Sequence, residues 1–178
     1  MRKTAMDFPY KRILITGCSG AGKSTLARKM GEKFGLPVVH LDRLWWLPGW
    51  VHREREEFDR LLTAELSKPA WIVEGNFSRT FPMRLQYADL CIYLDVDLDT
   101  CMEGIHARWE QYRGRTRPDM TEGCEEQADP EFEQWVRDFQ EDERPAMFRA
   151  MEESGVPRCV FTTRKEAYDW LDIEMNEI

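Results

Sequence analysis

One segment near the start of the chain constrains the fold more than any other feature. Residues 17–24 read G-x-x-x-x-G-K-S, the pattern of a phosphate-binding loop. A short apolar run over residues 12–16 precedes it, and a run of strong helix formers over 25–30 follows it. Such a loop requires a strand before it and a helix after it. The sequence therefore predicts a strand–loop–helix unit that binds the phosphates of a nucleoside triphosphate.

The side chains of this loop have distinct expected roles. Glycines let backbone N–H groups converge on an anion, and the helix that begins there adds its positive dipole end. We expect Lys23 to contact the β- and γ-phosphates, Ser24 to coordinate Mg²⁺ and Thr25 to lie near the α-phosphate. The residues of the loop expected to bind the nucleotide are Gly17, Ser19, Gly20, Ala21, Gly22, Lys23, Ser24 and Thr25.

Composition limits the classes of partner. The chain has 178 residues and a formal net charge of −8, with basic and acidic residues interspersed. We therefore expect no direct nucleic-acid binding, and the absence of a long apolar run predicts no membrane span. Residues 1–7 lack the apolar centre of a signal peptide, and the five cysteines show no framework spacing. These features predict a cytoplasmic protein with free thiols and a single domain over residues 1–178, while the oligomeric state stays open.

Strand and helix signals alternate along the whole chain. Further strands are predicted at residues 37–41, 70–73, 90–94 and 158–161. Helices are predicted over 53–66, 80–88, 99–112 and 164–174, and a further amphipathic helix begins near Phe132 and is interrupted at Pro145. This alternation is typical of a three-layer α/β fold with a parallel sheet covered on both faces. Ligands of such sheets bind at the carboxyl ends of the strands.

The segment after the second predicted strand carries a carboxylate and several tryptophans. Asp42 can orient or deprotonate an acceptor hydroxyl, or hold Mg²⁺ through water; the alternative is a helix or turn cap. Trp46 and Trp50 lie with Trp45 in an aromatic loop expected over 42–50. Their indoles can stack on an acceptor, or they can pack beneath a small lobe.

The segment after the third predicted strand begins with Glu74. A carboxylate at this position can contact Mg²⁺ or its waters. Gly75 lets the backbone approach a ligand, and we expect Asn76 to share in the acceptor site. Arg79 can donate two parallel hydrogen bonds to an acceptor phosphate or carboxylate; the alternative is that it is an ordinary surface arginine with no role in binding.

Four arginines lie within ten residues beyond the fourth predicted strand: Arg108, Arg113, Arg115 and Arg117. Arginines stabilise the charge that spreads over the transferred group in phosphoryl transfer. We expect Arg108 to bind the nucleotide, and the other three to act in catalysis together with Lys23 and Asp42. Gly114 and Pro118 favour a lid over residues 113–129. A solvated basic face that balances nearby acids is the alternative.

These segments resemble the adenylate-kinase-like group of small P-loop kinases. Residues 73–80 are similar to the D-G-F-P-R-T segment after the third strand of adenylate kinases, but are one residue longer and have Glu for Asp. A more specific resemblance, over nearly the whole chain, is to the adenylate-kinase-related DNA topology modulation proteins of bacteria. The segments that carry it are 17–24, 40–42, 46–50, 71–79 and 112–120.

The resemblance implies a P-loop NTPase fold with a five-stranded parallel sheet of order 2-3-1-4-5, a lid over the nucleotide and ATP as donor. It leaves the acceptor open, because the substrate of that group is poorly defined. The 42–70 insertion is similar in size to those of shikimate and gluconate kinases, so a hydroxylated metabolite and a nucleotide are both candidates. We therefore expect an ATP- and Mg²⁺-dependent phosphotransferase that acts on a small hydroxyl- or phosphate-bearing acceptor, a nucleotide or a metabolite. The alternatives are a nucleotide-binding regulator that influences DNA topology through partners, and a simple ATPase.

Overall fold

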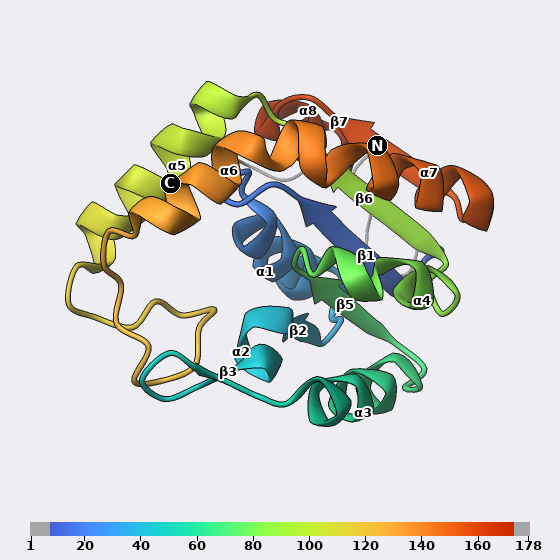
Figure 1. Ribbon diagram of the computed structural model, residues 1–178. Coiled ribbons are helices and arrows are strands. Elements are labelled where there is room, and N and C mark those ends of the chain that lie inside the picture. The colour runs from blue at the N-terminus through green and yellow to red at the C-terminus, as the bar shows by residue number, and fades with distance from the viewer. Residues whose placement is uncertain (1–7, 173–178) are drawn as a thin grey trace.

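The computed structural model describes residues 8–172 and contains a five-stranded parallel sheet (Figure 1). The strands lie in the order β2 (Val38–His40), β5 (Trp71–Glu74), β1 (Arg12–Gly17), β6 (Leu90–Leu94) and β7 (Arg158–Phe161). Counted along the chain within this sheet alone, the order is 2-3-1-4-5, as the resemblance implies. The labels skip β3 and β4 because these form a separate small sheet, which the sequence analysis did not predict.

Burial of the strands follows their position in the sheet. Every residue of the central strands β5 and β6 is buried, as are the residues of β1 after Arg12. The edge strands β2 and β7 are only partly covered. The near-continuous apolar strands at the centre thus pack on both faces, as expected for a parallel sheet between helical layers.

Helices cover both faces of the sheet. They are α1 (Lys23–Phe34), α3 (Arg55–Leu66), α4 (Phe81–Leu85), α5 (Leu98–Tyr112), α6 (Pro130–Asp142), α7 (Arg144–Ser154) and α8 (Arg164–Leu171). Right-handed crossovers place α1 on one face and the helices between β2 and β7 on the other. Lys33 of α1 donates to the carbonyl of Leu171, which ties α8 to the face of α1, while α4 packs against α7. Among residues 8–172, no helix has the length and apolar character needed to cross a bilayer.

Two irregular segments extend from the same edge of the sheet (Figure 1). The insertion between β2 and β5 contains α2 (Leu41–Trp45), the antiparallel pair β3 (Trp46–Leu47) and β4 (Val51–His52), and α3. The 113–129 segment runs between α5 and α6 and contacts the tip of this hairpin. The N–H of Gly49 donates to the carbonyl of Gly123 at 3.0 Å, and the Trp50 indole donates to the carbonyl of Glu125 at 3.0 Å. The two segments therefore form one hydrogen-bonded surface.

Three stretches differ from the sequence-based expectation. The aromatic loop expected over 42–50 is α2 followed by the β3–β4 hairpin, with Leu41 fully buried at the helix start. The helix expected over 80–88 is a 3-10 turn, η1 (Ser78–Thr80), followed by the short α4. The third strand extends to Glu74, whose backbone pairs with Ile15 of β1 and His40 of β2. The carboxylate of Glu74 is only 3% exposed but has polar partners in neighbouring elements. Pro145 lies at the start of α7 and separates it from α6, as predicted.

A buried arginine supports the turn after β5. Arg84 of α4 is fully buried and donates to the carbonyls of Gly75, Asn76 and Phe77. Burial lowers the pKa of its guanidinium to about 10. Since buried carbonyls without donors are costly, this side chain fixes the backbone that follows Glu74.

Replacing Arg84 should therefore weaken the fold. Arg84→Met keeps the aliphatic stem but removes the donors, so we expect the free energy of unfolding to fall by about 2–3 kcal/mol. Urea denaturation measures this, with the exposed Arg60 of α3 changed to Met as the matched control, for which we expect a change within about 0.5 kcal/mol. Equal stability of the two variants would contradict the role assigned to Arg84.

Candidate functional site

The predicted phosphate-binding loop connects β1 to α1 through three glycines with positive φ: Gly17, Gly20 and Gly22. Gly20 has a φ of 81°, and a Cβ built on it would lie 2.1 Å from the carbonyl oxygen of Cys101 in α5. Glycine is thus required at this position for both conformation and space. No described side chain caps the N-terminus of α1, so its first N–H groups are available to an anion.

Arg164, at the start of α8, supports the loop from behind. Its Nε donates to the carbonyl of Ala21 at 3.2 Å and its Nη2 to the carbonyl of Gly20 at 2.5 Å. Holding these carbonyls on one side leaves the N–H groups for the other. Arg164 was not among the predicted site residues, although it lies three residues after the end of the fifth strand, where the strand-end rule applies as it does to the other four.

Ser24 lies within a polar cluster at the ends of β2 and β5. Its Oγ is 2.9 Å from Oε1 of Glu74 and 3.1 Å from Oδ2 of Asp119. His40, the register partner of Glu74 across the two strands, places its Nδ1 2.6 Å from the same Oε1. Lys23, which is nearly buried, donates to the carbonyl of Cys18 at 2.8 Å. The loop, two strand ends and the 113–129 segment therefore meet at one point.

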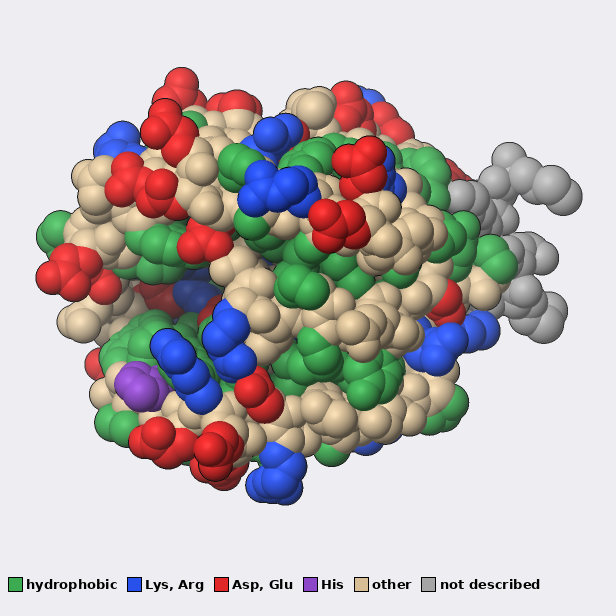
Figure 2. All heavy atoms as spheres, turned by 45° about the vertical axis from the view of Figure 1, so that its right-hand side comes forward, with side chains coloured by type: hydrophobic (Ala, Val, Ile, Leu, Met, Phe, Trp, Pro, Cys, Tyr) green, Lys and Arg blue, Asp and Glu red, His purple; other side chains and the backbone are tan. Residues whose placement is uncertain are grey.

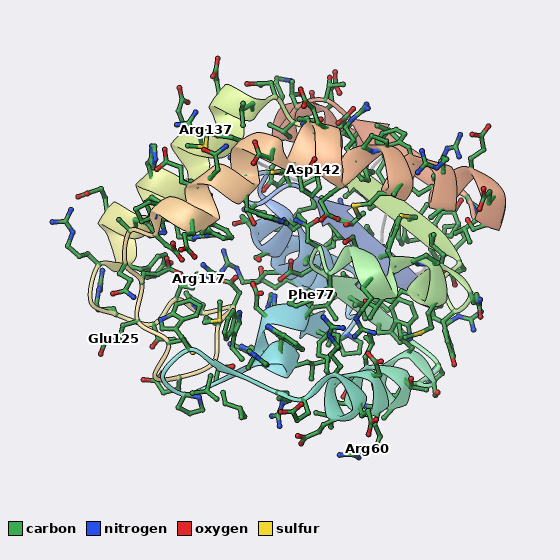
Figure 3. The ribbon with its side chains drawn as sticks, viewed as in Figure 1. Arg60, Phe77, Arg117, Glu125, Arg137 and Asp142 are labelled. Carbon is green, nitrogen blue, oxygen red and sulfur yellow. The ribbon has the colours of Figure 1, made fainter. Side chains whose placement is uncertain are left out.

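Arg117 extends from the 113–129 segment toward this cluster (Figure 3). Its guanidinium lies 3.1 Å from Asp42 and 3.0 Å from Asp119, and it also bonds Glu126. Burial alone would lower the pKa of Arg117, but the three carboxylates outweigh it and raise the pKa above its ordinary value. Only 5% of Arg117 is exposed, so its guanidinium is shielded from solvent, whereas the side chain of Asp42 is 32% exposed.

The carboxylates around Arg117 respond in opposite directions. Burial raises the pKa of Asp42 above its ordinary value, and Glu74 and Asp119 act in the same direction against Arg117. The pKa of Asp119 is lowered, because Arg117 and His40 outweigh its burial. Asp42 is therefore the stronger base of the two, and Asp119 stays ionised.

Arg108 reaches the same region from α5. Its Nε lies 3.8 Å from Oε2 of Glu126, and its guanidinium stands over the ring of Phe132, 5.9 Å from the centroid. Burial and the neighbouring charge of Arg117 lower its pKa. Its Nε is buried without a hydrogen-bond partner among the described residues, so this donor can serve a ligand.

These residues line a cavity of about 680 Å³. Figure 2 shows a recess on one side of the molecule with side chains of both charges inside it. Eleven predicted residues line the cavity: Ser19, Lys23, Ser24, Asp42, Trp46, Trp50, Glu74, Gly75, Asn76, Arg108 and Arg117. The sequence analysis missed Asp119, Glu126 and three aromatic residues, Trp109, Phe132 and Trp135. Asp119 follows Arg117 by two residues and lies within the 112–120 segment that carries the family resemblance, and these were its only signals.

The structure does not bring three predicted arginines to the cavity. Arg79 forms two hydrogen bonds with Asp59 of α3, at 2.6 and 3.1 Å, and is largely exposed. Arg113, which follows the end of α5, is exposed and forms an ion pair with Glu110 of that helix. Arg115 donates to the carbonyl of Gln111 and lines a second hollow of about 580 Å³, along with Arg43. Arg117 alone of the 113–117 arginines faces the loop.

The fold is shared with solved structures of small P-loop kinases. A shikimate kinase from Acinetobacter baumannii in complex with shikimate matches 94% of this chain and 97% of its own, with a TM-score of 0.57 and 14% identity. A shikimate kinase from Bacteroides thetaiotaomicron matches 92% and 99%, with a TM-score of 0.55 and 16% identity. A deoxyadenosine kinase from M. mycoides with bound dATP matches 90% and 95%, with a TM-score of 0.55 and 15% identity.

At these identities the likeness establishes the α/β fold of small P-loop kinases and no finer assignment. The sequence matches no family model, and no curated protein matches it. The resemblance to DNA topology modulation proteins is therefore not shown.

Removing the central guanidinium should loosen the 113–129 segment. Arg117→Met removes the cation that three carboxylates share and leaves only the more distant Arg108 beside Glu126. At a cost of about 3–5 kcal/mol for breaking a buried set of ion pairs, we expect a glutamate-specific protease to cut this segment at least about 10-fold faster. The rate of cleavage after Glu122 and Glu125 measures the effect. Arg137→Met is the control, since within residues 8–172 the one ion pair of Arg137 is a solvent-exposed contact with Glu133 on α6 (Figure 3). Equal cleavage of both variants would show that Arg117 does not hold the segment.

Proposed function

We propose that the protein is an ATP- and Mg²⁺-dependent phosphotransferase that moves the γ-phosphoryl group to a small acceptor. The observation that carries this proposal is that the phosphate-binding loop opens into the same cavity as Asp42 and Arg117. A donor site, a candidate base and a cation for the transferred group thus share one enclosed space. Phosphoryl transfer depends mainly on such positioning and on charge stabilisation.

The residues present fit a magnesium nucleotide. The Ser24 hydroxyl and the Glu74 carboxylate supply hard oxygen donors 2.9 Å apart beside the start of α1. Among residues 8–172, no group of three or more His, Cys, Asp or Glu side chains can hold a metal by itself. This suits Mg²⁺, which takes most of its ligands from phosphates and water. When bound, Mg²⁺ would neutralise charge on the phosphates.

The side chains of the cavity suit the transfer step. Asp42 would accept the proton of the acceptor hydroxyl as its oxygen bonds to the γ-phosphorus and the bond to the β–γ bridging oxygen breaks, releasing ADP. Its raised pKa makes it a better base near neutral pH. Lys23 and Arg108 would bind the phosphates, and Arg117 would face the transferred group from the 113–129 segment, which would act as a lid.

The comparisons support this proposal without naming the acceptor, since the fold matches kinases of different substrates. The segments 40–42, 46–50 and 112–120, which carry the resemblance to DNA topology modulation proteins, all contribute to the cavity or its rim. We therefore propose that the chain is related to the DNA topology modulation proteins. A reducing, cytoplasmic setting is also proposed, because all five cysteines are free thiols.

Acceptor-dependent release of ADP tests the proposal. With MgATP and a panel of nucleosides, nucleoside monophosphates and hydroxy acids, we expect at least one acceptor to raise the rate of ADP release about 10-fold or more. Lys23→Met should abolish that increase. ADP release at one rate with and without every acceptor would instead indicate a simple ATPase.

Exchanging Asp42 for Asn should separate activity from stability. We expect kcat to fall at least about 100-fold with binding of ATP retained, because the base is lost. The pKa of Asp42 is higher in the folded protein than in the unfolded chain. Ionisation of Asp42 therefore lowers the free energy of unfolding of the native chain once the pH exceeds the pKa of an unfolded aspartate. The stability of Asp42→Asn relative to the native chain should therefore increase from pH 4 to pH 8 in urea denaturation. A relative stability that falls over this range, or a kcat that is retained, would contradict the account.

A further inference from the structure

The charge of the cavity restricts what can bind beside the nucleotide. Six carboxylates line it: Asp42, Glu74, Asp119, Glu126, Asp129 and Glu143. Only three cations line it among the described residues, namely Lys23, Arg108 and Arg117. The walls therefore carry an excess of negative charge before any triphosphate enters. A second anionic group in this space would be repelled unless a cation were reserved for it.

No lining cation is reserved in this way. Arg117 already contacts three carboxylates, and Lys23 belongs to the phosphate-binding loop. Arg108 is near Glu126, and its free Nε is needed for the triphosphate in the proposed function. Arg79, the residue expected to hold an acceptor phosphate or carboxylate, is paired with Asp59 outside the cavity. The acceptor therefore meets walls that disfavour an anion.

Much of the remaining wall is aromatic. The aromatic residues that line the cavity are Trp45, Trp46, Trp50, Phe77, Trp109, Phe132 and Trp135. Trp46 and Trp50 stand edge to face with their centroids 5.3 Å apart, and Phe132 is stacked on Trp135 at 5.7 Å. Flat rings of this kind bind planar, apolar faces of a ligand through stacking and edge contacts. A small polyol or hydroxy acid offers no such face.

A polar group without a partner also lies in this wall. Asn76, in the turn after β5, lines the cavity, and both polar atoms of its amide are buried without a hydrogen-bond partner among the described residues. An amide offers a donor and an acceptor side by side, which matches the edge of a heteroaromatic base. Because unpaired buried polar atoms are costly, a ligand that pairs with both gains affinity.

From the charge, the aromatic walls and Asn76, we infer that the acceptor is an uncharged heteroaromatic alcohol of the nucleoside class, and neither a nucleoside monophosphate nor a hydroxy acid. This inference rests on the proposed function, since it names the acceptor of that site. The hydroxyl of the ligand would lie toward Asp42, with its ring between the aromatic side chains.

The test compares matched neutral and anionic probes on the full chain. Adenosine, guanosine, cytidine and thymidine are each paired with their own 5′-monophosphate, and shikimate and gluconate are added as hydroxy acids. Acceptor-dependent ADP release is measured with MgATP. Binding is measured separately by tryptophan fluorescence with Mg²⁺ and a non-hydrolysable ATP analogue at saturation, so that nucleosides do not occupy the donor site. We expect at least one nucleoside to exceed its monophosphate about 10-fold or more in both kcat/KM and affinity.

The two readouts separate failure of the inference from failure of the proposed function. Nucleoside binding without turnover would contradict the phosphotransferase and leave the ligand class standing. Stronger binding or faster turnover with a monophosphate or a hydroxy acid would overturn the ligand class, and so would the absence of binding by every neutral probe.

A pair of variants tests the role of Asn76. Asn76→Ala should raise the KM or Kd for the favoured nucleoside about 10-fold, because the amide pairs with the base edge. The control is Gln134→Ala, which removes an exposed amide from α6 and should change neither. Equal affinity in both variants would remove Asn76 from the site.

Discussion

The buried guanidinium of Arg117 joins three parts of the chain that are distant in sequence. It contacts Asp42 after β2 and, from its own segment, Asp119 and Glu126, and Asp119 in turn reaches Ser24 at the start of α1. A buried charge of this kind is tolerated only when its partners are in place. The relative positions of the 113–129 segment, the insertion and the phosphate-binding loop therefore depend on this one set of ion pairs. The hairpin contacts through Gly49 and Trp50 add to it from the outer side.

This arrangement also determines the electrostatics of the cavity. Arg117 is shared among three carboxylates and, in the proposed function, the transferred phosphoryl group, so it provides no further cation for an anionic group of the acceptor. The same neighbours act differently on the two aspartates: burial leaves Asp42 with a raised pKa, while Asp119 stays ionised. Two carboxylates near one cation thus acquire different properties from their surroundings, which is a common feature of sites that transfer protons.

The sheet and the strand–loop–helix unit around residues 17–24 were predictable from the sequence, because apolar runs and a glycine motif act locally. The contact partners of long side chains were not predictable from the sequence. Arg79 follows the third strand as expected, yet it turns to Asp59 of α3, which no local pattern indicates. Arg164 and Asp119 were missed for the same reason: each acts through a contact made only when separate loops fold together. Residues 42–50 were predicted as a loop, because strands of two residues are too short to show an alternating pattern of apolar and polar residues.

The destination of the γ-phosphoryl group tests the central claim most directly. The reaction is run with ATP in ¹⁸O-labelled water together with the acceptor that best stimulates ADP release, and the products are analysed by mass spectrometry. Phosphoryl transfer predicts a phosphorylated acceptor without ¹⁸O and little labelled inorganic phosphate. If ¹⁸O-labelled inorganic phosphate is instead the only phosphoryl product, water is the acceptor, and the protein is a hydrolase rather than a phosphotransferase.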